Sequence, residues 1–320
     1  MPGILNSVIL LVSMLTGGLL LWCASHLSLG YALLAAWLFC LVNNVPFSLT
    51  HEAVHGIGAK SASANRLLGT IAGWTFPLSF SMQRIAHLGH HQRNRTDVEM
   101  FDYYLPGQNK LLRNIWLYCG NLLGFYWVSV VAGNLVYLLA PWFCRSRWFT
   151  AKLAPALGFG EFVADIVQGP AVMIWLEMAL AFGYQAALYY FLDLNLAGMA
   201  LCYWAFALHW SALQYVDHAW SARDIRNGAW NLCVTPPARW LALNYHYHRV
   251  HHQHPNVPWY ELPRWAKQEA EKDGASREPS FWRVYFSLWK GVRPAPPMGA
   301  PADLAFLFPG EQPGQNCAEN

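Results

Sequence analysis

Charged side chains are scarce along this chain of 320 residues. Lys, Arg, Asp and Glu together make up 12% of it and hydrophobic residues make up 55%, whereas soluble domains carry about 25% charged residues. The 17 Trp, 17 Phe and 15 Tyr residues are typical of proteins with aromatic belts at the two membrane interfaces. The composition therefore predicts an integral membrane protein.

Several sequence patterns are also missing, and each absence excludes a class of protein. The net charge is only +3 and no basic run is present, so we expect no nucleic-acid partner. None of the seven cysteines forms a C-x-x-C pair, which excludes a cysteine-bound zinc or iron–sulfur site of the usual spacing. The G-x-G-x-x-G fingerprint of a dinucleotide site is absent as well.

Long apolar segments occur in two pairs. Residues 4–23 and 29–48 form the first pair, and residues 171–192 and 196–215 form the second. Each segment is long enough to cross about 30 Å of hydrocarbon, and only a short connection separates the members of a pair. We therefore expect an all-α integral membrane fold with four transmembrane helices in two hairpins.

The basic residues predict how the hairpins are oriented. All 21 Lys and Arg residues lie at or after Lys60, and none lies between 153 and 222. Both hairpin tips lack them, so by the positive-inside rule the tips face away from the cytoplasm. The histidine-rich segments that follow each hairpin then form a cytoplasmic cap. We expect the membrane to be a bacterial inner membrane.

Three further segments bear on the organisation of the chain. Residues 114–142 are apolar, but a single crossing there would invert the second hairpin, so we expect this segment to lie in the interface or to enter and leave on one side. The short segment 67–80 carries Pro77 and is also expected to be interfacial. Residues 1–290 are predicted to form one membrane domain, and the Pro/Gly-rich residues 291–320 a disordered tail.

Histidines supply the most specific signal. Eight of the thirteen fall into the clusters HEAVH, HLGHH and HRVHH, namely His51 and His55, then His87, His90 and His91, and finally His248, His251 and His252. Positions i, i+3 and i+4 share one face of a helix, so each cluster can direct its imidazoles to one point. Eight histidines exceed the needs of one tetrahedral zinc and suit a two-metal site.

Two other interpretations of the clusters remain open. H-E-x-x-H is typical of zinc metalloproteases, with His51 and His55 as zinc ligands and Glu52 as the general base. That interpretation does not explain the two later clusters, HLGHH and HRVHH. A membrane protein that binds metal without catalysis is the other alternative.

The three clusters together resemble the histidine boxes of the membrane-bound fatty acid desaturase/hydroxylase superfamily. HRVHHQHPNVPWYELP is similar to the third box of that family, and the likeness extends over residues 30–265. It implies a centre of two Fe ions, O2 as co-substrate and the eight box histidines as metal ligands. His218 in QYVDHAW matches the place where members often have a ninth, and Gln214 the place of a polar or water-mediated partner.

Carboxylates near the boxes are candidate partners of the metal-bound imidazoles, because such imidazoles usually donate their other N–H to an acceptor. Asp97 and Asp217 are the preferred partners, and ion pairing with nearby arginines is the alternative. Glu52 is a further candidate for this outer layer. It stands where many acyl desaturases have Asp, a departure that weakens an assignment to the acyl-lipid branch.

The resemblance implies O2-dependent oxidation of a fatty acid or fatty acyl chain drawn from the bilayer. Desaturation is favoured, and decarboxylation of free fatty acids to terminal 1-alkenes and hydroxylation are the alternatives, because the boxes suit all three. No fused cytochrome b5 motif occurs, since His254 and Pro255 are followed by Asn-Val. The resemblance therefore implies a separate electron donor, a ferredoxin, rubredoxin or similar carrier, with its reductase.

Overall fold

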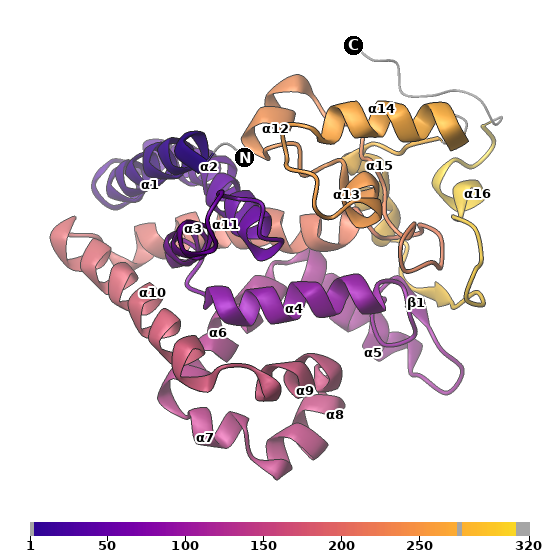
Figure 1. The fold of residues 1–320 in the computed structure, drawn as a ribbon, viewed down its shortest axis with the longest axis horizontal. Helices are drawn as coiled ribbons and strands as arrows, with labels where there is room; N and C mark the ends of the chain where they lie inside the picture. The colour runs from indigo at the N-terminus through magenta and orange to yellow at the C-terminus, as the bar shows by residue number, and fades with distance from the viewer. Residues whose placement is uncertain (1–2, 274–276, 312–320) are drawn as a thin grey trace. The chain divides into compact units, whose positions relative to one another are not determined.

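The computed structural model describes residues 3–273 and 277–311, and helices dominate this part of the chain. In chain order the helices are α1 (Gly3–His26), α2 (Leu29–Val54), α3 (Ala62–Trp74), α4 (Phe80–Arg93), α5 (Lys110–Ile115), the π-helix η1 (Trp116–Leu122), α6 (Phe125–Leu139), α7 (Pro141–Cys144), the π-helix η2 (Phe149–Leu153), α8 (Ala154–Ala156), α9 (Gly160–Gln168), α10 (Ala171–Phe191), α11 (Leu196–Val216), α12 (Pro236–Leu241), α13 (His248–Gln253), α14 (Leu262–Asp273), α15 (Phe281–Leu288) and α16 (Leu304–Leu307). Two short strands, β1 (Tyr103–Tyr104) and β2 (Arg293–Pro294), pair in parallel. Figure 1 shows these elements along the chain.

The four predicted spans are confirmed. Within the described residues α1, α2, α10 and α11 are long and apolar enough to cross a membrane, which gives the expected all-α membrane fold. Helix α2 has 26 residues and is therefore about 39 Å long, which exceeds a hydrocarbon layer of about 30 Å. Its last turn extends beyond the apolar segment that the sequence defines and carries the first histidine cluster.

The chain divides into two compact units. We call the first the span unit, which comprises the residues up to Gly89 together with Tyr126–His209, and the second the cap unit, which comprises His90–Phe125 together with the residues from Trp210 onward. Helices α4 and α11 each run from one unit into the other.

Both hairpin tips lie on one side of the span unit. The side chain of Asn195, just before α11, donates a hydrogen bond to the carbonyl of Ser25 near the end of α1. The same side chain accepts one from the backbone N–H of Gly198 at 2.7 Å, which caps the start of α11. Helices α2 and α11 therefore both begin at this side of the span unit.

A buried carboxylate ties the second hairpin to helix α4. Glu177 lies inside α10 and is only 3% exposed. It accepts hydrogen bonds from Arg66 at 2.7 Å, the Ser79 hydroxyl at 2.8 Å and the Ser81 backbone N–H at 2.7 Å. Ser81 belongs to the first turn of α4, where the helix dipole favours a negative charge. Glu177 thus fixes the start of the helix that carries the second histidine cluster.

Replacing Glu177 with alanine is expected to lower the free energy of unfolding by about 3 kcal/mol, because it leaves a buried Ser hydroxyl, a backbone N–H and an arginine without their acceptor. Thermal unfolding of the detergent-solubilised protein measures this as a lower midpoint. Glu161→Ala on the exposed face of α9 is the control and is expected to stay within about 0.5 kcal/mol of the wild type. Equal midpoints for the two variants would contradict the capping role.

The third apolar stretch is not one continuous helix. It is divided between α5 with η1 and the following α6, and Gly124 at the break has a φ of +86°. The helices before and after the break are bent by 82°, which makes a simple single span a poor description. Residues 67–80 form most of α3 and the connection to α4, too short to cross. That both segments lie in the interface stays a prediction.

The expectation of a disordered tail differs from the structure up to residue 311. Val292, Leu307 and Phe308 are buried in a hydrophobic core of the cap unit, which also includes Trp220. The backbone N–H of Val292 also donates to Asn114 at 2.8 Å. Composition indicates disorder only when a segment lacks apolar side chains to bury, and these Pro/Gly-rich residues include several. Residues 312–320 lie outside the described part of the chain.

Candidate metal centre

The first histidine cluster lies where α2 ends. His51 is in the last turn of the helix, and His55 is its C-terminal cap residue. His87 lies on α4, which begins six residues after α3 ends. Since α2 continues without a break beyond the apolar segment, the packing of the spanning helix itself holds His51 and His55 in place.

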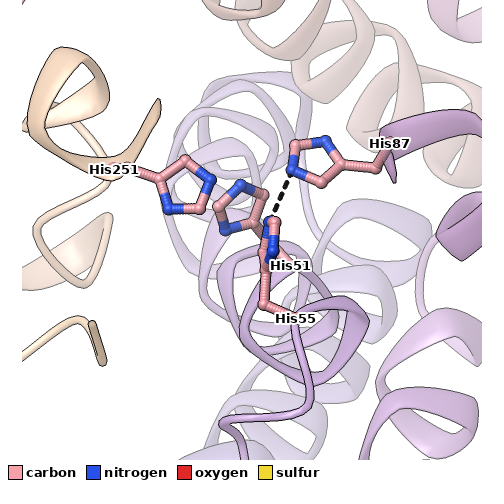
Figure 2. A group of neighbouring side chains, drawn as sticks. All are labelled: His51, His55, His87 and His251. Carbon is pink, nitrogen blue, oxygen red and sulfur yellow. Dashed lines mark hydrogen bonds between the residues drawn. The ribbon is translucent and has the colours of Figure 1, made fainter. Parts of the chain in front are cut away.

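His51, His55 and His87 form a three-histidine group in the span unit. The ring centroids of His51 lie 5.2 Å from His55 and 4.4 Å from His87, and those of His55 and His87 are 4.9 Å apart. The Nε2 atoms of His55 and His87 are 2.9 Å apart, as the dashed line in Figure 2 marks. All three rings meet edge to face, and each offers a ring nitrogen within 4.8 Å of those of the other two.

A four-histidine group lies within the cap unit. It consists of His90 from α4, His218 just after α11, and His248 and His252 from α13. The Nε2 atom of His218 is 3.2 Å from that of His90 and 3.0 Å from that of His248. His248 and His252 approach to 3.2 Å through the same atoms. The four nitrogens thus surround one point.

The partners of two of these rings fix which nitrogen carries the proton. Nδ1 of His90 lies 2.9 Å from a carboxylate oxygen of Glu99, and Nδ1 of His218 lies 2.8 Å from the carbonyl oxygen of Gly228. A carboxylate or carbonyl oxygen accepts, so both Nδ1 atoms donate. In the neutral rings both Nε2 atoms then carry lone pairs, and these face each other at 3.2 Å. Such an arrangement calls for a cation between them.

The spacing of the four nitrogens also suits a metal ion. Imidazole nitrogens bind a first-row metal at about 2.1 Å, so two ligands of one ion lie about 3.0–3.4 Å apart at angles between 90° and the tetrahedral value. The measured separations of 3.0–3.2 Å match this range. Neutral imidazoles suit iron as well as zinc, so the residues fit the iron that the sequence predicts.

Burial keeps the group in its ligand-competent form. Burial lowers the pKa of His218 well below its usual value, and the nearby His90 adds to this effect. Burial and then His248 lower the pKa of His252 in the same way. Burial alone would raise the pKa of Glu99, but its interaction with His90 lowers it. Lowered pKa values keep His218 and His252 in the neutral form that binds metal, and the lowered pKa of Glu99 keeps it an acceptor.

The clusters do not each converge on a point of their own, as their helical spacing had suggested. His90 belongs to the four-histidine group, whereas Nε2 of the neighbouring His91 faces Nε2 of His251 at 3.0 Å. His251 in turn lies between two members of that group on α13. Adjacent helical residues point about 100° apart, so each cluster divides its imidazoles. The four-histidine group consequently combines parts of two clusters with His218.

The predicted outer partners have different surroundings. Asp97 is exposed on its side chain (61%) and pairs with Arg223 at 2.7 Å, the alternative that the sequence left open. Asp217 is buried beside His218 and His248. Gln214 has a buried amide nitrogen without a hydrogen-bond partner in the described chain, and Glu52 is buried on α2. The roles of Gln214 and Glu52 stay predictions.

Two groups that hold imidazoles were not selected from the sequence. Glu99 was one of several nearby carboxylates, and nothing in its spacing of nine residues from His90 distinguished it. Gly228 acts through its backbone carbonyl, which sequence reasoning does not reveal. A Cβ atom at Gly228 would collide with Asp224 and Arg95, so only glycine allows the close approach that brings this carbonyl to His218.

Comparison with known protein families agrees with the resemblance that the histidine clusters indicate. The model of a family described as fatty acid desaturase matches residues 7–284, which include all three histidine clusters and His218. No curated protein matches the chain.

Proposed function

Because the chain belongs to the fatty acid desaturase family, and is thus a desaturase-like membrane oxidoreductase, we propose that it is a di-iron enzyme that uses O2 to introduce a double bond into a fatty acyl chain. The eight histidines of the clusters, together with His218, are the nine proposed iron ligands. The four-histidine group binds one iron and the three-histidine group contributes to the other, and His91 and His251 complete the set.

One observation in the structure supports a bound metal independently of family membership. The Nε2 lone pairs of His90 and His218 face each other because Glu99 and Gly228 hold the opposite nitrogens as donors. Without a cation this contact between two acceptors is unfavourable. Iron bound there would activate O2, which is the oxidant that removes hydrogen from an unactivated C–H bond, while Glu99 and the Gly228 carbonyl keep the rings oriented.

The balance of the reaction requires an external reductant. Desaturation converts –CH2–CH2– and O2 to –CH=CH– and two H2O, which consumes two electrons and two protons in addition to those of the substrate. The sequence has no dinucleotide fingerprint, so we propose that a separate ferredoxin, rubredoxin or similar carrier, kept reduced by its own reductase, delivers the electrons. The substrate would enter from the bilayer as a fatty acid or a fatty acyl derivative.

Product analysis tests the proposed reaction. Membranes that contain the protein are supplied with one saturated even-carbon fatty acid, a reduced ferredoxin system and O2, and the products are separated by gas chromatography. A mono-unsaturated product of unchanged chain length is expected. A terminal alkene one carbon shorter would identify decarboxylation instead, and a hydroxylated acid would identify hydroxylation.

The proposed orientation places the histidines on the cytoplasmic face, because the hairpin tips carry no basic residue. A cysteine introduced in place of Asp193 at the second tip is expected to react with a membrane-impermeant maleimide added outside the cytoplasm. One introduced in place of Lys272 on α14 is expected to react only after the membrane is opened. The reverse labelling pattern would contradict the proposed orientation, whereas the assignment of the metal ligands does not depend on it.

A further inference from the structure

One carboxylate beside the four-histidine group has no partner that explains its burial. Asp217 is 1% exposed, and neither of its carboxylate oxygens has a hydrogen-bond donor among the described residues. No Lys or Arg in the described chain pairs with it, whereas the buried Asp102 pairs with Arg95 at 2.7 Å. Burying a carboxylate without a cation or a hydrogen-bond donor costs several kcal/mol. The protein groups around Asp217 do not offset this cost by themselves.

The two oxygens of Asp217 point toward imidazole nitrogens of the metal group. Oδ2 lies 3.5 Å from Nε2 of His248, and Oδ1 lies 3.8 Å from Nε2 of His218. These are the same nitrogens that converge with His90 and His252. Nε2 of His218 bears a lone pair, because Nδ1 donates to Gly228, so here too one acceptor faces another.

The separations are too long for hydrogen bonds and suit ligands of one ion. Two atoms that each lie about 2.1 Å from a metal are about 3.0 Å apart at a right angle and about 4.2 Å apart when opposite. Oxygen–nitrogen distances of 3.5 and 3.8 Å fall between these limits. Non-heme iron also commonly binds carboxylate oxygens together with imidazole nitrogens.

The backbone holds this carboxylate in place. Asp217 follows the last residue of α11, and its carbonyl accepts the N–H of Trp230 at 2.7 Å. Three residues further on, the N–H of Trp220 donates to Asp102 at 2.7 Å. The short segment that carries Asp217 and His218 is therefore fixed on both sides, and the two side chains are presented to the group together.

We propose that the carboxylate of Asp217 is a ligand of the metal that His90, His218, His248 and His252 bind, and adds one oxygen to their four nitrogens. This inference rests on the proposed function. Nine neutral imidazoles leave the charge of two divalent irons uncompensated in a buried site, and one carboxylate offsets part of it. Asp217 would thus be an inner ligand and not an outer partner of an imidazole.

The test compares Asp217→Asn with the wild type, each with iron removed and each reloaded anaerobically with Fe(II). Asn is almost the same size but carries no charge. Without iron, Asp217→Asn is expected to unfold at the same or a higher temperature, because an unpartnered carboxyl has been removed. With Fe(II), it is expected to gain less stabilisation, with Fe(II) affinity at one site lowered at least about 10-fold. Asp97→Asn is the matched control and should resemble the wild type in both states.

Mössbauer spectra of the ⁵⁷Fe-loaded proteins give a readout that folding alone does not change. Asp217→Asn is expected to alter or remove the signal of one iron and to leave the other unchanged. The inference is overturned if the variant is less stable or unfolded without iron, or if its affinity and spectra equal those of the wild type. Failure of the wild type to bind iron would overturn the proposed function as well.

Discussion

Replacing His248 with alanine is expected to abolish product formation and to reduce bound iron from about two to about one per chain. Nε2 of His248 lies 3.0 Å from Nε2 of His218, 3.2 Å from Nε2 of His252 and 3.5 Å from Oδ2 of Asp217. Its loss therefore removes a ligand from the middle of the four-histidine group. Iron analysis and product yield on the same purified sample measure both effects.

His254→Ala is the matched control for this prediction. His254 lies immediately after α13, as close in sequence to the third cluster as any other histidine, but it pairs with Glu269 at 3.1 Å and belongs to neither metal group. Iron content and product yield near those of the wild type are expected for this variant. Full activity of His248→Ala, or equal losses in both variants, would refute the assignment of His248 as a ligand.

Glu99→Gln is expected to lower activity by about 10- to 100-fold, the usual effect of removing the partner that orients a metal-bound histidine. The glutamine retains the size of the side chain, but it can present its NH2 group to Nδ1 of His90 and so favour the wrong tautomer. Nε2 would then carry the proton and lose the lone pair that faces His218. Product yield at saturating substrate and Fe(II) affinity measure the loss.

The chain supplies a closely matched control for Glu99. Glu269 also accepts from a histidine, His254, at 3.1 Å compared with 2.9 Å for the Glu99 pair, but that histidine is outside the metal groups. Glu269→Gln is expected to change activity by less than about twofold, because this partly buried pair lies outside both metal groups. If both glutamine variants lose activity equally, Glu99 does not act through the metal.

The sequence predicted the spans and the histidine chemistry because each depends on local patterns. An apolar run of about 20 residues can satisfy its backbone in lipid only as a helix, so α1, α2, α10 and α11 were readable from length and hydropathy. The absence of Lys and Arg near both tips predicted their common side, which the hydrogen bond between Asn195 and Ser25 supports. The histidine clusters were visible because their members lie close together in the sequence.

The arrangement of the ligands depends on tertiary structure and was not readable in this way. Spacing grouped His90 with His91, yet the fold directs the first to His218 and the second to His251. The choice of Glu99 over Asp97 likewise follows from how the turn after α4 folds back toward His90. The C-terminal segment was misjudged because composition was given more weight than the apolar residues Leu307 and Phe308, which complete the core of the cap unit.

The most direct test of a two-iron centre is the metal content of the full chain purified from cells grown with iron and zinc. Elemental analysis by mass spectrometry is expected to give about two irons per chain and no stoichiometric zinc, because the proposed reaction with O2 needs a redox-active metal and zinc has no redox chemistry. One zinc per chain without iron would contradict the account and favour the metalloprotease alternative for the H-E-x-x-H motif.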